Sequence, residues 1–182
     1  MLLLILLGFS RELRKLGFCN GPGLSRVISP LDPIRLGKAP IETPRRVMGD
    51  LLGNAVRFGI ADDVLTAGEG IETMLSLRCV LPAMPMVAAL SANHLAAIQL
   101  PPALRRLYIA RDADLAGDHA ATTLTGRSQG AGIETIALSP RLGDFNEDLR
   151  ALGIDELWAD VRVQLAPQDV VRFILTATAR TK

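Results

Sequence analysis

Cysteine is scarce in this sequence, and the two that occur, Cys19 and Cys79, lie far apart and form no CxxC pair. Without clustered cysteines, the chain has neither the thiolate ligands of a structural zinc site nor the pairs that build a disulfide framework. Scarce cysteine is also typical of proteins in reducing compartments. We therefore expect a cytoplasmic protein without structural zinc.

The sequence also lacks a marked excess of positive charge, since its formal net charge is only +1. Proteins that hold nucleic acid through a broad nonspecific surface usually carry a clear basic excess. Basic residues do gather locally, at Arg11–Lys15, Arg45–Arg46 and Arg105–Arg106, but a solvated face is the favoured explanation for each. We expect no extended basic surface.

Long apolar runs are missing too. The apolar start, Met1–Phe9, is too short to cross a bilayer. It also has neither the charged beginning nor the cleavage site of a signal peptide. We therefore expect no membrane partner.

Aromatic residues make up only 4% of the chain, although 49% of its residues are hydrophobic. The core must therefore consist mainly of Leu, Ile, Val and Ala. Such a core suits an α/β fold, in which buried strands are aliphatic and the helices are rich in Ala and Leu.

Short apolar runs alternate with helical patterns over about ninety residues. The runs that predict strands are 63–67, 86–90, 107–110 and 133–138. The segments that predict helices are 71–80, 95–99, 116–129 and 145–152. Because buried aliphatic strands that alternate with helices are typical of parallel sheets, we expect an α/β fold with a parallel four-stranded sheet flanked by helices.

The remaining segments predict the domain organisation. Residues 1–24 are weakly patterned, and residues 25–60 form a lead-in of loops and short β elements, rich in Pro and Gly. The sheet domain covers 61–153, and 154–182 is a tail of one or two amphipathic helices.

Acidic residues follow two of the predicted strands. Glu69 comes just after the first strand, and Asp112 and Asp114 come just after the third. Ligands of parallel sheets bind outside the carboxyl ends of the strands, and clustered carboxylates without histidine or cysteine favour Mg²⁺ or Mn²⁺. A magnesium ion held in this way completes its shell with phosphate oxygens, so phosphoryl or nucleotidyl transfer is the natural chemistry.

Structural roles could also account for these residues. Asp114 could simply cap the helix that follows it. Glu69 could be a turn residue between two permissive glycines, Gly68 and Gly70. On spacing alone, both interpretations stay open.

Short motifs recur through this region in a fixed order. They are Gly68–Thr73 (GEGIET), Ala89–Asn93 (ALSAN), Asp112–Gly117 (DADLAG) and Asp144–Glu147 (DFNE). In this order and spacing, the sequence over 31–152 resembles the Toprim family, whose sheet is Rossmann-like. It is most similar to the branch found in primases and primase-helicases of phages, plasmids and integrated elements.

The resemblance implies a role for each acidic residue. Glu69 would act as general acid or base, and Asp112 and Asp114 would bind Mg²⁺, with Mn²⁺ as a substitute. Asp144 is a weaker metal ligand by the same resemblance, and capping of the next helix explains it equally well. Arg111, which precedes the DxD, is a candidate for contact with substrate phosphate. The implied activity is primase-like nucleotidyl transfer during replication of a mobile element, on single-stranded DNA and nucleotides.

Several alternatives remain. The chain has neither the zinc segment of full primases nor the P-loop of primase-helicases, which favours a non-catalytic module that docks on a replicative helicase, whereas the intact Glu69, Asp112 and Asp114 argue against it. A metal-dependent nuclease would use the same carboxylates with water as nucleophile. A topoisomerase is disfavoured because the only tyrosine, Tyr108, falls inside a strand where its side chain should be packed. A dinucleotide binder ranks last, because no G-x-G-x-x-G follows the first strand.

Overall fold

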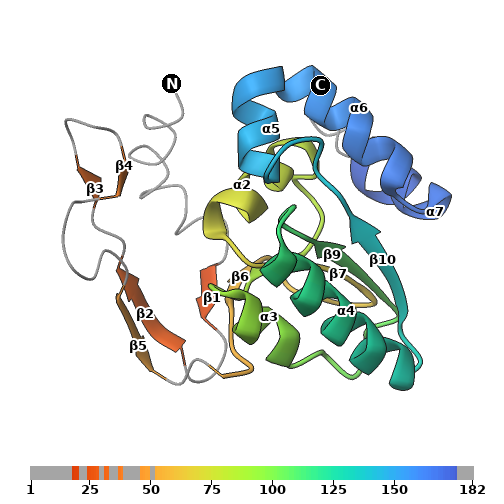
Figure 1. Cartoon of the computed structure of the whole chain (residues 1–182). Coiled ribbons are helices and arrows are strands. Elements are labelled where there is room, and N and C mark those ends of the chain that lie inside the picture. The colour runs from red at the N-terminus through yellow and green to blue at the C-terminus, as the bar shows by residue number, and fades with distance from the viewer. Residues whose placement is uncertain are drawn as a thin grey trace.

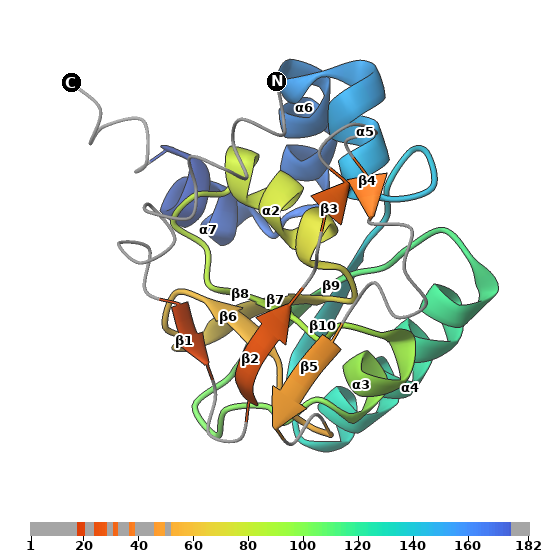
Figure 2. The same cartoon turned by 90° about the vertical axis from the view of Figure 1, so that its left-hand side faces the viewer.

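A computed structural model describes the backbone of residues 18–20, 24–28, 31–32, 37–38, 46–49 and 52–175, and the side chains of residues 52–174. A six-stranded sheet forms its centre, with helices on both faces (Figures 1 and 2). The expectations for Arg11–Lys15 and for Met1–Phe9 concern residues outside the described part.

Four neighbouring strands of the sheet run parallel, as the alternating pattern predicts. They stand in the order β8-β7-β9-β10. Their bounds are β7 Val64–Gly68, β8 Met86–Ala88, β9 Arg106–Ala110 and β10 Glu134–Leu138. Of these four strands, the first in the chain, β7, therefore lies between the second, β8, and the third, β9.

Two further strands extend the sheet beyond β8, and the apolar pattern did not predict their place in it. β6 (Val56–Phe58) pairs antiparallel with β8, and β1 (Phe18–Asn20) pairs antiparallel with β6. The lead-in also forms two small antiparallel pairs. These are β2 (Leu24–Ile28) with β5 (Arg46–Gly49), and β3 (Leu31–Asp32) with β4 (Gly37–Lys38).

Helices cover the sheet in two layers (Figure 1). One face carries α3 (Ala92–Ala97) and α4 (Leu115–Gly130). The other carries α2 (Ile71–Val80), α5 (Phe145–Leu152) and α6 (Ile154–Gln164). The bounds of α2 and α5 coincide with the predicted ones, whereas α3 begins three residues earlier than predicted, because Ser91 caps it.

Alternation along the central strands builds the two halves of the core. In β9, Leu107 and Ile109 face the α3–α4 layer, whereas Tyr108 and Ala110 face the α2–α5–α6 layer. All four side chains are buried. A strand that is buried on both faces consists almost entirely of apolar residues. This explains why the apolar runs in the sequence predicted these strands.

The C-terminal tail packs on the α2–α5–α6 face. After α6, the short helix α7 (Pro167–Asp169) leads into a π-helical turn, η1 (Val170–Leu175). The tail contributes buried apolar side chains to the core: Leu157, Val161, Leu165, Phe173 and Ile174. Within the described residues, no helix is both long and apolar enough to cross a bilayer.

Candidate metal centre at the carboxyl ends of the parallel strands

The predicted acidic residues follow the ends of strands that are neighbours in the sheet. Glu69 follows β7, Asp112 lies two residues after the end of β9, and Asp144 closes the loop that leaves β10. Because β7 is joined to β8 on one side and β9 on the other, Glu69 and Asp112 flank the point where the strand order reverses. In open parallel sheets, ligands bind at this point.

Backbone hydrogen bonds fix the loop that carries Glu69. The amide of Leu90, just past β8, donates to the carbonyl of Glu69 at 2.8 Å, and the amide of Ala89 donates to Gly68 at 2.9 Å. To make these bonds, Leu90 adopts a φ of 77°, a region that is unfavourable for a side chain with a Cβ. The ALSAN motif thus supports the loop of the GEGIET motif.

The glycine of the DADLAG motif lets α4 begin directly against the strand end. A Cβ added at Gly117 would lie 2.5 Å from the carbonyl oxygen of Asp112, closer than real Cβ contacts. The Asp114 carboxylate also accepts a hydrogen bond from the Gly117 amide at 2.7 Å and is the N-cap of α4. The capping interpretation of Asp114 is therefore confirmed, and the second oxygen of this carboxylate is left for another partner.

The DFNE loop is tied to the DADLAG loop by one backbone bond, from the amide of Ala113 to the carbonyl of Gly143 at 2.8 Å. Asp144 caps α5 by accepting from the Glu147 amide at 2.7 Å, which confirms its predicted capping role. Phe145 is fully buried in the core and anchors this helix.

A buried carboxylate that the sequence analysis missed shapes the same loop. Asp148 is only 1% exposed, and its two oxygens accept from the amides of Arg141 and Leu142, each at 2.9 Å. Nothing in the local sequence distinguishes it from the exposed Glu147 beside it. Asp148 therefore positions the loop before Asp144 without facing a ligand itself.

Asp112 has the most unusual electrostatic environment of the group. Burial, followed by the negative charges of Glu69, Asp144 and Asp114, raises its pKa from the ordinary 3.8 to about 6. Its Oδ1 atom is buried without a hydrogen-bond partner. A buried carboxylate oxygen that lacks a donor and faces other carboxylates is in a position that a cation would stabilise.

The donor set fits magnesium held largely by water and substrate. Among residues 52–174, no three acidic, histidine or cysteine side chains stand together as a ready-made metal shell. Magnesium does not need such a shell, because it commonly binds through one or two carboxylates and keeps several waters or phosphate oxygens. Asp112 offers an unpartnered oxygen, and Asp114 and Asp144 each use one oxygen for capping.

Other residues singled out in the sequence have structural partners. The Arg111 guanidinium donates to Ser139 at 2.9 Å and pairs with Asp118 on α4, so it joins β9, β10 and α4. Tyr108 is fully buried, which confirms that it is packed inside its strand. In the ALSAN motif, Asn93 lies within α3, and Ser91 is the N-cap, since its hydroxyl accepts from the His94 amide.

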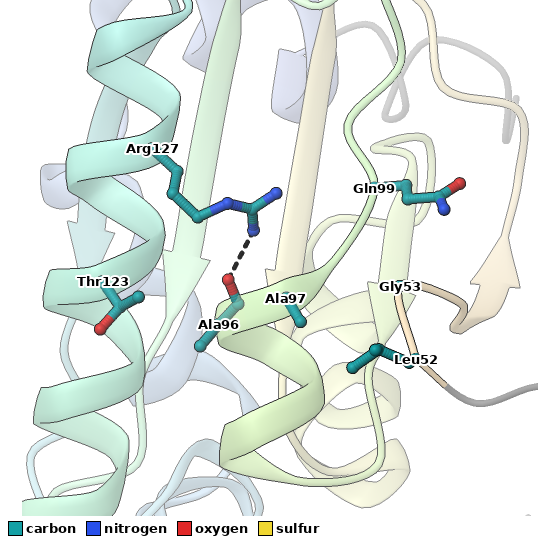
Figure 3. Close-up of a pocket in the computed structure, with 7 residues that line it drawn as sticks. All are labelled: Leu52, Gly53, Ala96, Ala97, Gln99, Thr123 and Arg127. Carbon is teal, nitrogen blue, oxygen red and sulfur yellow. Dashed lines mark hydrogen bonds between the residues drawn. The ribbon is translucent and has the colours of Figure 1, made fainter.

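A pocket between α3, α4 and the turn before β6 is distinct from the acidic cluster (Figure 3). Its lining consists of Leu52, Gly53, Ala96, Ala97, Gln99, Thr123 and Arg127. The Arg127 guanidinium is held there by the carbonyls of Ala96 and Ile98 at the end of α3. The arginine therefore closes the helix end, and no acidic residue lines the pocket.

Comparison with solved structures places this fold beside those of DNA primases. A DNA primase domain from Pseudomonas aeruginosa matches with a TM-score of 0.51 and 18% identity, over 74% of this chain and 50% of that one. The Aquifex aeolicus primase (zinc-binding and RNA polymerase domains) matches with a TM-score of 0.49 and 19% identity, over 71% of this chain and 36% of that one. This chain thus spans half or less of those structures.

Comparison with curated proteins found no match. The family model of the Toprim domain matches residues 64–155, just over half of the 182-residue chain. The match runs from β7 to the first turn of α6 and includes every acidic residue of the cluster. The chain belongs to the Toprim domain family.

Proposed function

We propose that this protein catalyses Mg²⁺-dependent nucleotidyl transfer on nucleic acid, as a DNA primase does, with Mn²⁺ as a substitute ion. The observation that carries the proposal is the Asp112 carboxylate, which has one unpartnered buried oxygen among the charges of Glu69, Asp144 and Asp114. This cluster lies at the strand ends of a Toprim fold, where phosphate-bearing ligands are expected.

Each residue has a role in the proposal. Asp112 and Asp114 would hold the ion and Asp144 would assist them; a bound ion would supply positive charge opposite the phosphate. Glu69, on the neighbouring strand end, accepts or returns the proton of the attacking or leaving hydroxyl. Arg111 is proposed to contact phosphate from beside the cluster, in exchange for one of its present partners.

The proposed substrates are single-stranded DNA and nucleotides, because a primase joins nucleotides on such a template. The four motifs in order support replication of a mobile element as the biological setting. We also propose that the protein is cytoplasmic and that it binds a replicative helicase.

A Toprim-type nuclease is the second candidate. The same carboxylates would serve it, with water in place of a terminal hydroxyl as the nucleophile. A non-catalytic docking module is the third. In that role the acidic cluster would be structural, and no product would form.

Calorimetric titration of Mg²⁺ tests the metal site directly. The proteins compared are wild type, the double variant Asp112→Asn/Asp114→Asn and the control Asp62→Asn, whose side chain is exposed and outside the cluster. Asparagine is chosen at position 114 because it still caps a helix, so a lost heat signal would report lost charge and not a damaged α4. We expect binding in wild type and in the control, and none in the double variant.

A parallel assay with labelled single-stranded DNA, a primer and nucleotides distinguishes the three functions. Extension of the primer supports nucleotidyl transfer, whereas shortening of the DNA supports the nuclease. Glu69→Gln should bind Mg²⁺ yet form no product, because it leaves the ion's carboxylates in place. Metal binding without any product would favour the docking module, and metal binding unchanged in the double variant would contradict the proposed site.

A further inference from the structure

Two exposed leucines stand next to the acidic motifs in the chain. Leu115, the first residue of α4, is 89% exposed, and Leu142 in the loop before Asp144 is 37% exposed. Ala113 and Ala116 are exposed as well. These four residues are called the apolar rim here. Because Leu115 is almost fully solvated, it makes no contribution to the core that would explain a large apolar side chain.

The rim borders the acidic cluster on two sides. Leu115 follows Asp114 directly, and Leu142 precedes Asp144 by two residues. The hydrogen bond from the Ala113 amide to the Gly143 carbonyl joins the segment before α4 to the loop that carries Leu142, so the two leucines lie in segments that contact each other. A ligand held at the cluster would therefore lie within reach of the rim.

The two arginines nearest the rim in sequence are both engaged by acidic partners. Arg111 pairs with Asp118, and Arg141 pairs with Glu156 at 3.1 Å and with Asp160 at 3.3 Å. Their positive charges are thus already balanced within the protein. The face around the cluster therefore presents carboxylates and apolar side chains to a ligand, with little unpaired positive charge from these arginines.

We infer that the apolar rim holds the bases of a single nucleic-acid strand whose phosphate is bound, through a divalent ion, at the acidic cluster. The inference rests on the proposed function and adds which residues beside that site would contact the substrate. Every base has an apolar face. Contact between these faces and Leu115 and Leu142 would therefore remove apolar surface from water without discriminating between nucleotide sequences. A bound divalent ion would then supply most of the positive charge opposite the phosphate, beside the contact proposed for Arg111.

This arrangement has a measurable consequence for salt dependence. Affinity for nucleic acid falls with salt in proportion to the number of phosphates that lysine and arginine neutralise. With a rim that contacts bases, we expect a shallow salt dependence, corresponding to about two released counterions or fewer. If unpaired arginines held the strand instead, the affinity would fall more steeply with salt concentration.

The test is fluorescence anisotropy with a labelled oligo(dT) strand and full-length protein in excess Mg²⁺. The variants are Leu115→Ala/Leu142→Ala, the conservative Leu115→Met/Leu142→Met, and Val163→Ala, which removes an 82% exposed side chain on α6 that is not part of the rim. We expect the alanine pair to weaken binding by roughly tenfold, and the methionine pair and Val163→Ala to leave it within about twofold. An abasic strand of equal length should bind wild type about as weakly as oligo(dT) binds the alanine pair.

Mg²⁺ titration of the alanine pair, with a thermal melt, shows whether the cluster and the fold are intact. If the alanine pair binds oligo(dT) as well as wild type does, or the abasic strand binds wild type as tightly as oligo(dT), the rim does not contact bases and this inference alone fails. If wild type binds no strand in Mg²⁺, the proposed function fails, and the inference fails with it.

Discussion

Asp112 combines burial, neighbouring negative charge and an oxygen without a hydrogen-bond partner. In the folded protein its pKa is raised to about 6, whereas its ordinary value is 3.8. Between these values the folded state binds the proton more strongly than the unfolded state does. Without metal, the free energy of unfolding should therefore fall as pH rises from about 4 to about 6, and the loss is complete above that window.

The first prediction is that Asp112→Asn stabilises the metal-free protein at pH 8 by about 1–2 kcal/mol, a figure reduced for the partial exposure of the residue. At pH 4 the variant and wild type should unfold almost alike, because Asp112 is then protonated. Urea unfolding at both pH values in the presence of EDTA measures this. Asp62→Asn is the control, and an equal pH dependence in wild type and Asp112→Asn would contradict the assignment.

Gly117 matters for a steric reason. An alanine Cβ there would lie 2.5 Å from the Asp112 carbonyl oxygen, and backbone cannot move aside as a flexible side-chain end can. Gly126, in the same helix, has no heavy atom within 4 Å of the position its Cβ would take. Alanine at Gly126 is therefore a matched control for alanine at Gly117, because the two positions share a helix and differ in the space available to a Cβ.

The second prediction is that Gly117→Ala destabilises the protein by about 2–3 kcal/mol and weakens Mg²⁺ binding, since Asp112 must shift. Gly126→Ala should be neutral or stabilising by up to about 1 kcal/mol, because alanine is the better helix former. Denaturant unfolding and calorimetry of both variants test this. Similar losses in the two variants would show that close approach at Gly117 is not the cause.

Helix α4 begins at the cluster, so one carboxylate has both a capping and a proposed metal role. Asp114 accepts from the Gly117 amide, which satisfies one of the unpaired amides of the first turn. Asparagine can make the same bond without the charge, whereas alanine cannot. The two substitutions therefore separate the two roles.

The third prediction is that Asp114→Ala lowers the free energy of unfolding by about 1 kcal/mol, whereas Asp114→Asn changes it by less than about 0.5 kcal/mol. Both should reduce the thermal stabilisation that added Mg²⁺ gives to wild type. Thermal melts with and without Mg²⁺ measure both effects. If Asp114→Asn keeps the full Mg²⁺ stabilisation, Asp114 is a cap only.

At the scale of the whole molecule, two of the ion pairs between the C-terminal tail and the rest of the chain differ in burial. Asp169, 2% exposed, accepts from the Tyr108 hydroxyl at 2.6 Å and from Arg106 at 2.9 Å. Arg172 pairs with Asp63 at 2.7 Å, but both side chains are 44% exposed. Burial decides what each contact contributes, because water screens the exposed pair.

The fourth prediction is that Asp169→Ala destabilises the protein by about 2 kcal/mol, since it leaves the buried Tyr108 hydroxyl without its acceptor and removes one of the two carboxylates that pair with Arg106. Arg172→Ala should cost less than about 1 kcal/mol. Denaturant unfolding of the two variants is the measurement. Equal costs would mean that the buried contact does not hold the tail.

The apolar and helical patterns of the sequence were enough to predict the strands and helices that surround the acidic cluster. The aliphatic runs of β7 and β9 are visible because both faces of these strands are buried, and helical spacing located α2 and α5 to the residue. The parallel arrangement then put Glu69 and Asp112 at one edge of the sheet, because strand ends meet there. The order of the motifs indicated the Toprim family, which the family model confirms.

Contacts between distant parts of the chain were beyond the reach of such patterns. Nothing local to Val56–Phe58 says that it pairs with β8, and nothing in Asp148 or Asp169 distinguishes these buried carboxylates from exposed ones. Apolar periodicity reports whether a residue faces a core, but not which distant segment supplies the other side of it. Strand partners, the burial of Asp112 and the exposure of Leu115 depend on such long-range packing, and so they emerged only from the folded chain.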